Sequence, residues 1–491
     1  MSIPKICGIE NEFGFSVFKR GSGIQQMGEN YGAIAEEFVG GYLKLLDAVT
    51  YDPTRESRRK SILKKLKIKS PKESLEDLIH SRSIAKCSEW GGFLGNGARF
   101  YLDVSHPEYC TPECRLPLDL VAHDKASEVV IREALRVFNL SESGRKFEIV
   151  LHKSNSDGDG DSYGTHLNVL MSRASVSNEE NFGYFLKHYV PFQIARMILI
   201  GGGKFGYENG APKCGFQISQ RADFFTQLYS ANTVEKRPIF NLRDEPHADS
   251  EKYFRLHDIS TDALMCEGAM FLRAGLSQIV LAMIEDKYLT DDLFPADPVA
   301  AIKIVSRDLD FEMPVQLSCG KQMTGLEILR YYVDKCGDYL KANPMHEQHN
   351  LAVALAKELI DKLDNDLLST FGILDWTTAL GIHESRPENT VKNLLKFREM
   401  SDDSLYGKFL KIGKIKRFIT DEQILAACEF APRDTRAFIR GELIKKGRDK
   451  IKLMNWSYVI LGKEVNRLQL ELDVPDIDEA ACLMILSKLA T

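Results

Sequence analysis

Short stretches in which apolar and polar residues alternate are spread along the chain. Successive side chains of a β-strand point to opposite faces, so a period of two is typical of strands with one buried and one polar face. Between these stretches lie longer ones with apolar residues every three to four positions, the spacing of one face of an α-helix. The pattern predicts strands at residues 5–15, 98–104, 147–153, 166–171, 215–220 and 456–461, and helices at 118–138, 261–285 and 347–368.

The order of these elements indicates the class of fold. Strands and helices do not alternate strictly, so we expect an α+β fold whose mostly antiparallel sheet is covered by helices on one face. From about residue 420 the pattern changes to short helices, a final strand pair and a last helix. We therefore expect a large domain over residues 1–415 and a small C-terminal domain over residues 420–491.

Charge and composition narrow the class of protein. The chain of 491 residues has 64 Lys and Arg against 70 Asp and Glu, a net charge of −6, which argues against a nucleic-acid coat. It has no run of about 18 apolar residues and no apolar leader at its start, so we expect no membrane span and no secretory signal. Ten cysteines without a CxxC pair indicate reduced thiols in a cytoplasmic protein. Residues 55–72 are strongly basic, and a solvated Lys-rich helix or a docking site for an acidic partner explains them.

The strand at 98–104 presents chemically useful side chains. Its alternation places Arg99, Tyr101 and Asp103 on one face and apolar residues on the other. Taken alone, this is also the pattern of an ordinary solvated strand face.

Three more strands repeat the same division and strengthen the interpretation. Their polar sides carry Glu10 with Glu12, His166 with Asn168, and Gln217 with Ser219 and Arg221. A sheet face that gathers carboxylates and arginines suits Mg²⁺, which prefers carboxylate oxygens, and phosphates, which pair with Arg. The charged loop 241–249, which contains His247, adds further candidates.

Six motifs, in chain order, resemble the Pup ligase/depupylase family. They are IENEFG, NGARFYLDVSHPEY, DSYGTH, GFQISQRADF, RDEPHADSEKY and DTRAFIRGE. The family is related to glutamine synthetase and the carboxylate–amine ligases. The resemblance runs from residue 3 to about residue 460 and is thin at 20–92 and 290–415. It implies ATP and Mg²⁺ as cofactors, a glutamine-synthetase-like fold, and Pup, a small disordered ubiquitin-like modifier, or a Pup-like protein as partner.

The resemblance also implies roles for individual residues. Asp103 matches the catalytic aspartate of the family. Other residues match its metal-binding or nucleotide-contacting positions, or lie in motifs that line the same site. For the metal they are Glu10, Tyr101, Glu108, His166 and His247. For the nucleotide they are Arg99, Thr111, Arg221 and Trp456.

The family has two branches, which make or hydrolyse the isopeptide bond between Pup and a substrate lysine. Two residues separate Asp103 from His106, as in the depupylase/deamidase branch, whereas the ligase branch usually has three. Two departures stand against this assignment: Leu167 replaces the usual Glu after His166, and the basic 55–72 segment replaces an acidic loop. The favoured interpretation is a monomeric depupylase, with a Pup ligase, a non-catalytic Pup-binding protein and a small-molecule carboxylate–amine ligase as alternatives.

Overall fold

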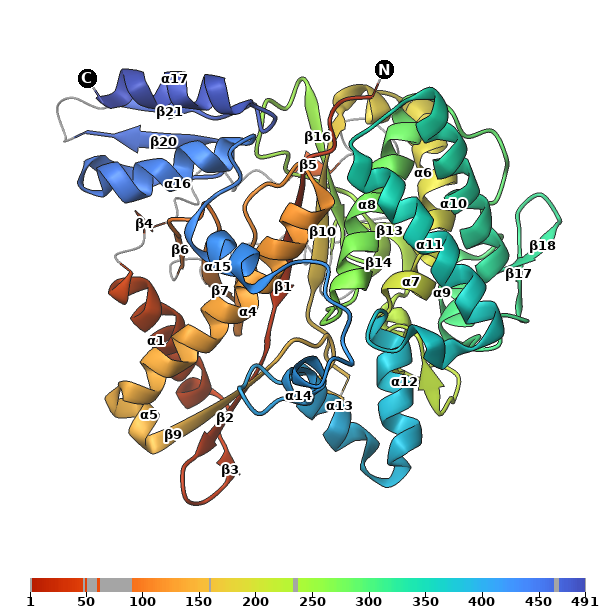
Figure 1. The fold of residues 1–491 in the computed structure, drawn as a ribbon, viewed down its shortest axis with the longest axis horizontal. Helices are drawn as coiled ribbons and strands as arrows, with labels where there is room; N and C mark the ends of the chain where they lie inside the picture. Colours follow the sequence, from red (N-terminus) through yellow and green to blue (C-terminus); the bar gives the residue numbers. More distant parts are fainter. Residues whose placement is uncertain are drawn as a thin grey trace.

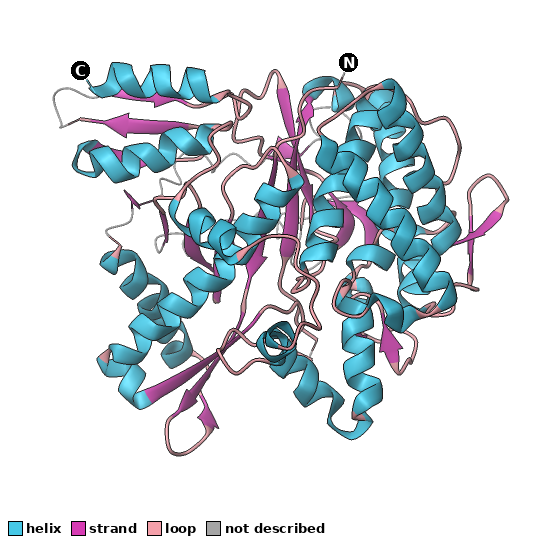
Figure 2. Ribbon diagram, in the orientation of Figure 1, coloured by secondary structure: helices cyan, strands magenta, loops and turns pink. Residues whose placement is uncertain are grey.

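A seven-stranded antiparallel sheet forms the centre of the protein (Figures 1 and 2). The computed structural model describes residues 2–46, 49–50, 60–61, 91–158, 160–232, 237–462 and 468–490. The strand order is β16-β10-β1-β8-β7-β6-β4. The bounds of these strands, in chain order, are β1 Cys7–Glu12, β4 Val49–Thr50, β6 Gly91–Phe93, β7 Arg99–Asp103, β8 His106–Cys110, β10 Thr165–Ser172 and β16 Tyr253–Asp258.

Helices cover the apolar face of this sheet, as the sequence predicts. Side chains such as Ile9, Phe100 and Leu167 are buried there. The helices that contact the strands are α1 (Glu29–Leu45), α4 (Pro117–Leu140) and α8 (Glu267–Glu285). An outer layer packs on α4 and α8 and includes α6 (Glu179–Ala195), α10 (Gly325–Ala342), α11 (Glu347–Asn365) and α15 (Asp421–Glu429). Helix α8 is long and apolar enough to cross a membrane, but its apolar stretch is wholly buried inside the fold, as in the core helix of a globular protein.

Four predicted boundaries differ from the structure. The strand expected at 5–15 is divided at Phe13 into β1 and β2 (Gly14–Lys19), and β2 joins a separate sheet with β3 (Ile24–Gln25) and β9 (Phe147–His152). The helix expected from residue 261 begins at Glu267. The residues just before it make hydrogen bonds to other loops instead: the Asp262 carboxylate accepts from the backbone N–H groups of Gly202 and Gln220. The helix expected at 347–368 is α11, which ends at Asn365, three residues before the predicted end.

The fourth difference concerns the strand expected at 215–220. Only β12 (Phe216–Gln217) forms there, paired with β11 (Lys204–Phe205) outside the main sheet. Both faces of this segment are buried, so its alternating pattern does not mark one buried and one solvated side.

The C-terminal residues build a second hydrophobic core. Strands β19 (Ile451–Met454), β20 (Tyr458–Leu461) and β21 (Leu468–Glu471) form a three-stranded sheet instead of the expected pair. Helices α16 (Arg436–Gly447) and α17 (Glu479–Ala490) pack against each other in the same unit (Figure 1). Its buried cluster runs from Phe438 to Cys482 and includes Phe93, whereas α15 packs on α4 in the main core. The division at residues 415–420 stays a prediction.

Ion pairs join this unit to the main sheet. The carboxylate of Glu113, three residues after β8, accepts hydrogen bonds from Arg436, at 2.7 Å, and from Arg440. Arg115 makes a further pair with Asp434, at 3.0 Å. Burial by itself would raise the pKa of the Glu113 carboxyl, but Arg440 and Arg436 outweigh it and lower the pKa to about 2.

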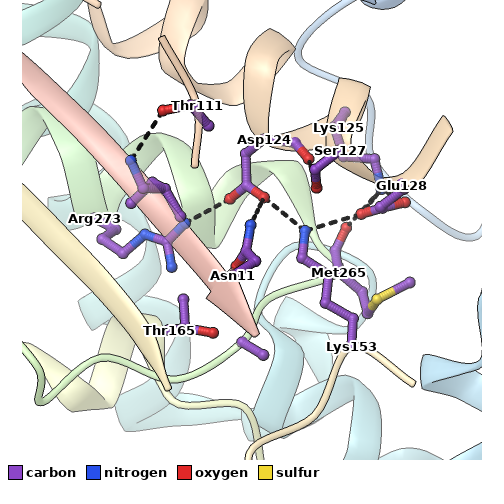
Figure 3. A network of polar contacts seen from close by, with 12 residues as sticks. Asn11, Thr111, Asp124, Lys125, Ser127, Glu128, Lys153, Thr165, Met265 and Arg273 are labelled. Atoms are coloured by element: carbon purple, nitrogen blue, oxygen red, sulfur yellow. Dashed lines mark hydrogen bonds and ion pairs between the residues drawn. The ribbon is translucent and has the colours of Figure 1, made fainter. Parts of the chain in front are cut away.

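A network of buried charges lies beneath β1 (Figure 3). The carboxylate of Asp124 on α4 accepts hydrogen bonds from Asn11 of β1 (2.9 Å), Lys153 (2.7 Å) and Arg273 (2.6 Å). Lys153 also reaches Glu128, which pairs with Lys125. Each of these charged side chains is at most 6% exposed, so each charge depends on its partners for stabilisation.

We expect Asp124→Asn to lower the free energy of unfolding by about 3–5 kcal/mol, because it leaves the charges of Lys153 and Arg273 buried without a carboxylate between them. Denaturant unfolding followed by circular dichroism measures this loss. Asp402→Asn is the matched control, since the pair of Asp402 with Arg136 is exposed and contributes about 1 kcal/mol at most. Equal effects of the two substitutions would contradict the role given to the network.

The pairing of Glu113 should make stability depend on pH. Its pKa in the folded state lies below the ordinary value of 4.5, so the ion pairs stabilise the fold fully above that value and lose their effect as the pH falls toward 2. At neutral pH the contribution is about 3 kcal/mol. The difference in unfolding midpoint between the natural protein and Glu113→Gln should therefore be large at pH 7 and shrink below pH 5. A difference that stays constant down to pH 3 would exclude this account, and the exposed Glu142→Gln serves as the control.

Candidate active site

The polar face of the main sheet brings together most of the residues singled out in the sequence. Arg99, Tyr101 and Asp103 follow one another along β7, and in the neighbouring strand β8 Glu108 lies opposite Tyr101. Beyond β8, Glu12 lies opposite Glu108. Glu10 and His166 face each other across β1 and β10. Leu167 is fully buried on the other face, so the departure at this position does not remove a group from the polar face.

Three carboxylates form a tight cluster at the end of this face. One oxygen each of Glu12, Asp103 and Glu108 lies within 4.8 Å of the others. Burial, Asp103, Glu10 and Glu12 all raise the pKa of Glu108, and burial and Glu12 raise that of Asp103 to about 6, against the opposing charges of Arg243 and Arg99. Tyr101 donates its hydroxyl hydrogen to Glu108. Like charges at this distance repel, so the cluster favours a bound cation or a retained proton.

A second cluster joins Glu10 to two histidines. The carboxylate of Glu10 lies 3.1 Å from Nδ1 of His166 and 3.1 Å from Nε2 of His257. Burial lowers the pKa of His257 to about 3, so its imidazole is neutral and able to ligate a metal. Arg255, at 3.3 Å, and Asn168, at 3.0 Å, hold the other oxygen of Glu10.

A pocket opens beside this second cluster. The pocket is open to solvent, and the space inside it that can hold the centres of water-sized groups is about 90 Å³. Four of the predicted residues line it: Glu10, Thr111, His247 and Trp456. Cys110, Arg255 and Arg436 also border it. Trp456 comes from the C-terminal unit and packs edge-on against Phe93 at 5.0 Å between ring centres, so the pocket lies where the two cores meet.

Arg99 and His247 have a contact or a backbone conformation that the alternation does not indicate, and Arg221 lies away from the main sheet. His247 lies in the pocket with a φ of 50° and lines it together with Glu10, and its role as a metal ligand stays a prediction. Arg99 is buried with its guanidinium 3.8 Å from the centre of the Tyr101 ring. Arg221 is outside the main sheet, where it donates to the carbonyl of Ile259. Burial and Arg237 lower its pKa to about 10, against the opposing effect of Glu12.

Two residues of β16, Arg255 and His257, complete the site without having been identified from the sequence. The segment Tyr253–Asp258 alternates between outward and buried side chains, so the period-two pattern was present there. Glu12 and Asn168 were placed on the polar face from the sequence but were given no role. Cys110 lies on the same face, with Sγ 3.4 Å from an oxygen of Glu108.

The donor set fits the cofactors that the sequence implies. Mg²⁺ prefers carboxylate oxygens, and the Glu12–Asp103–Glu108 cluster gathers three of them at the cost of mutual repulsion. The adjoining pocket has an aromatic side chain, Trp456, and two arginines, Arg255 and Arg436, which suit the base and phosphates of a nucleotide.

A sheet face with a cluster of three carboxylates and a second cluster of one carboxylate and two histidines, beside a pocket of this kind, is suited to a divalent cation and a phosphate-bearing ligand. Comparison with known proteins gives the family. The family model for "Pup-ligase protein" matches residues 5–460. The chain belongs to this family of ATP-using enzymes.

Relatives from both branches of the family are similar to this chain. The Pup deamidase/depupylase of Mycolicibacterium smegmatis is 36% identical over 377 residues, 75% of this chain and 74% of that protein. The depupylase of Acidothermus cellulolyticus is 32% identical over 480 residues, 93% and 90% of the two chains. The Pup–protein ligase of Acidimicrobium ferrooxidans is 34% identical over 391 residues, 76% and 84%.

Solved structures show the same fold. The complex between the prokaryotic ubiquitin-like protein Pup and its ligase PafA matches with a TM-score of 0.80 and 25% identity, over 99% of this chain and 92% of that one. The Pup ligase PafA in complex with ADP matches with a TM-score of 0.74 and 27% identity, over 86% and 96%. The predicted α+β fold is confirmed.

The repulsion within the carboxylate cluster predicts opposite effects of one substitution on stability without and with a bound metal. Without metal, Glu108→Gln should melt at or above the temperature of the natural protein, because it removes a buried carboxyl group whose ionisation the neighbouring carboxylates oppose. With Mg²⁺ or Mn²⁺, the natural protein should gain stability by linkage while the variant gains little. Differential scanning fluorimetry in EDTA and over a metal titration measures both. A metal-dependent shift that persists undiminished in Glu108→Gln would exclude this residue as a ligand, and Glu142→Gln is the exposed control.

Proposed function

We propose that this protein is a depupylase/deamidase. It hydrolyses the isopeptide bond between the C-terminal Glu of Pup, or of a Pup-like modifier, and a substrate lysine, and it converts a C-terminal Gln of the modifier to Glu. The observation that carries the proposal is the hairpin beside Asp103. Asp103 and His106 are paired in register with only two residues between them, the spacing of the depupylase branch. Relatives named as depupylases support it, at 36% and 32% identity over 75% and 93% of this chain.

Asp103 is the residue placed to act on the scissile bond. It stands at the end of the polar face, half-buried, and belongs to the carboxylate cluster. A pKa raised to about 6 places the carboxyl near the operating range of a general base. In this role Asp103 takes a proton from the attacking water and passes it to the departing lysine amine, or it attacks the carbonyl carbon to form an anhydride that water then hydrolyses.

The remaining residues bind and orient. Glu10, Tyr101, Glu108 and His166 are proposed to hold Mg²⁺, with His257 joining them. Arg99, Thr111 and Trp456 are proposed to bind ATP. Arg221 is proposed to offset the negative charge of the phosphates. When bound, Mg²⁺ would supply positive charge, and the phosphates of the nucleotide would form one wall of the site. Pup or a Pup conjugate is the proposed partner, and a monomer the proposed state.

A Pup–protein ligase is the second candidate. The two solved relatives described above are Pup ligases, and the ligase of Acidimicrobium is 34% identical. In that reaction Asp103 would take the proton from the incoming lysine amine instead of from water.

The test uses purified protein with Mg²⁺ and ATP and two substrates side by side. One is a Pup–lysine isopeptide conjugate, and the other is free Pup ending in Glu together with an acceptor protein. Release of free Pup without stoichiometric loss of ATP is the expected result. New conjugate with matching ADP and phosphate would overturn the proposal in favour of the ligase, and activity on neither would reject both.

Asp103→Asn keeps the shape of the side chain and removes the base. We expect turnover to fall about 10²- to 10⁴-fold, while ATP binding, measured by fluorescence of a nucleotide analogue, stays within twofold. The matched control is Asp402→Asn on the exposed surface, which should change neither quantity. Full turnover in Asp103→Asn would reject Asp103 as the catalytic residue.

A further inference from the structure

The turn that follows Asp103 contains an unusual residue. Val104 and Ser105 form the two-residue turn between β7 and β8. Val104 has a φ of 53° and is the only β-branched side chain with positive φ among the residues that the structure describes. A positive φ at the first central position of a hairpin turn is the usual place of glycine, and for a β-branched residue it is strained.

Burial does not compensate for this strain. The Val104 side chain is 56% exposed, so an apolar group stands in solvent at the tip of the hairpin. The tip is nevertheless held firmly. The hydroxyl of Tyr31 donates to the carbonyl oxygens of Phe15, at 2.9 Å, and Ser105, at 3.3 Å, and the His106 ring packs on Tyr163 at 4.6 Å between ring centres. Strain that the surrounding structure maintains is found most often at functional sites.

The position of Val104 suggests what it contacts. It directly follows Asp103, so the two Cα atoms are about 3.8 Å apart. In the proposed reaction, the bond that is broken joins a carboxyl group to the amine at the end of a lysine side chain. A lysine whose isopeptide bond lies near Asp103 has four methylene groups that extend away from the bond, and Val104 is an exposed apolar side chain on the residue next to Asp103. An apolar side chain at this point would shield methylene groups from water.

We propose that Val104 is a specificity-determining residue that contacts the aliphatic stem of the substrate lysine. The inference rests on the proposed isopeptide chemistry at Asp103, and it holds whether the bond is made or hydrolysed. It predicts that Val104 matters for reactions that involve lysine and not for reactions at the same carbonyl that lack a lysine stem. Deamidation of a C-terminal Gln is such a reaction, since its leaving group is ammonia.

The experiment compares two reactions in each variant. In Val104→Gly we expect kcat/KM for cleavage of a Pup–lysine conjugate to fall about 10-fold, the effect of losing two or so apolar contacts. Deamidation of Pup ending in Gln should stay within twofold. The melting temperature should rise, because glycine accepts the positive φ. Val104→Thr keeps the branched shape and should lose conjugate cleavage without the gain in stability, and Val104→Ile should keep both properties of the natural protein.

Each other outcome overturns a specific part of the inference. An equal fall of both reactions would show that Val104 acts on Asp103 and not on lysine, and no fall in either would exclude any contact. Lys287→Gly is the matched control, because Lys287 has a φ of 54° and is exposed outside the site. It should leave both reactions unchanged. If the natural protein proves to be a ligase, the same comparison uses lysine and hydroxylamine as acceptors. Natural protein inactive in all of these reactions would reject the proposed function itself.

Discussion

The carboxylate of Asp124 is the contact on which the geometry of the site depends. It lies beneath the sheet and accepts a hydrogen bond from Asn11, the residue between Glu10 and Glu12 in β1 (Figure 3). Since neighbouring side chains of a strand point to opposite faces, a bond that fixes Asn11 below the sheet also fixes the two glutamates above it. Lys153 and Arg273 hold Asp124 in turn, from the loop after β9 and from α8. The polar face is therefore anchored from its apolar side by a buried network.

The charged groups on the two sides of β1 are therefore arranged differently. Below β1, each buried charge has an opposite partner, and the network is stable without any ligand. Above it, Glu12, Asp103 and Glu108 lie close together, and burial together with their mutual repulsion raises the pKa of Glu108. Folding energy from the network below holds this repelling cluster in place, which is the arrangement expected of a preorganised cation site. The C-terminal unit adds Trp456 and Arg436 to the pocket through the ion pairs of Glu113.

Alternation along the chain predicted much of this face and failed where burial is two-sided. Arg99, Tyr101 and Asp103 share a face because helices pack on one side of β7. The same reasoning put Glu10 and His166 on the polar face. It failed for Arg221, since residues on both sides of β12 are buried and the strand belongs to another sheet. It passed over β16, where Arg255 and His257 stand two positions apart, and only His247 of the adjoining charged loop was singled out. The basic segment 55–72 lies outside the described residues apart from positions 60 and 61, so its role stays a prediction.

In the proposed function, hydrolysing and forming the isopeptide bond involve the same carbonyl carbon and the same lysine nitrogen. Ligation also needs ATP to activate the carboxyl group, so it is not the reverse of hydrolysis. The two reactions also differ in what would reach Asp103 from solvent, either water or a lysine amine. The β7–β8 turn is the part of the main sheet adjacent to that carboxylate. It is held by Tyr31 and Tyr163 and carries an exposed apolar side chain in a strained conformation. A short turn that is rigid and apolar can control the access of both nucleophiles without any change in the groups that perform the chemistry.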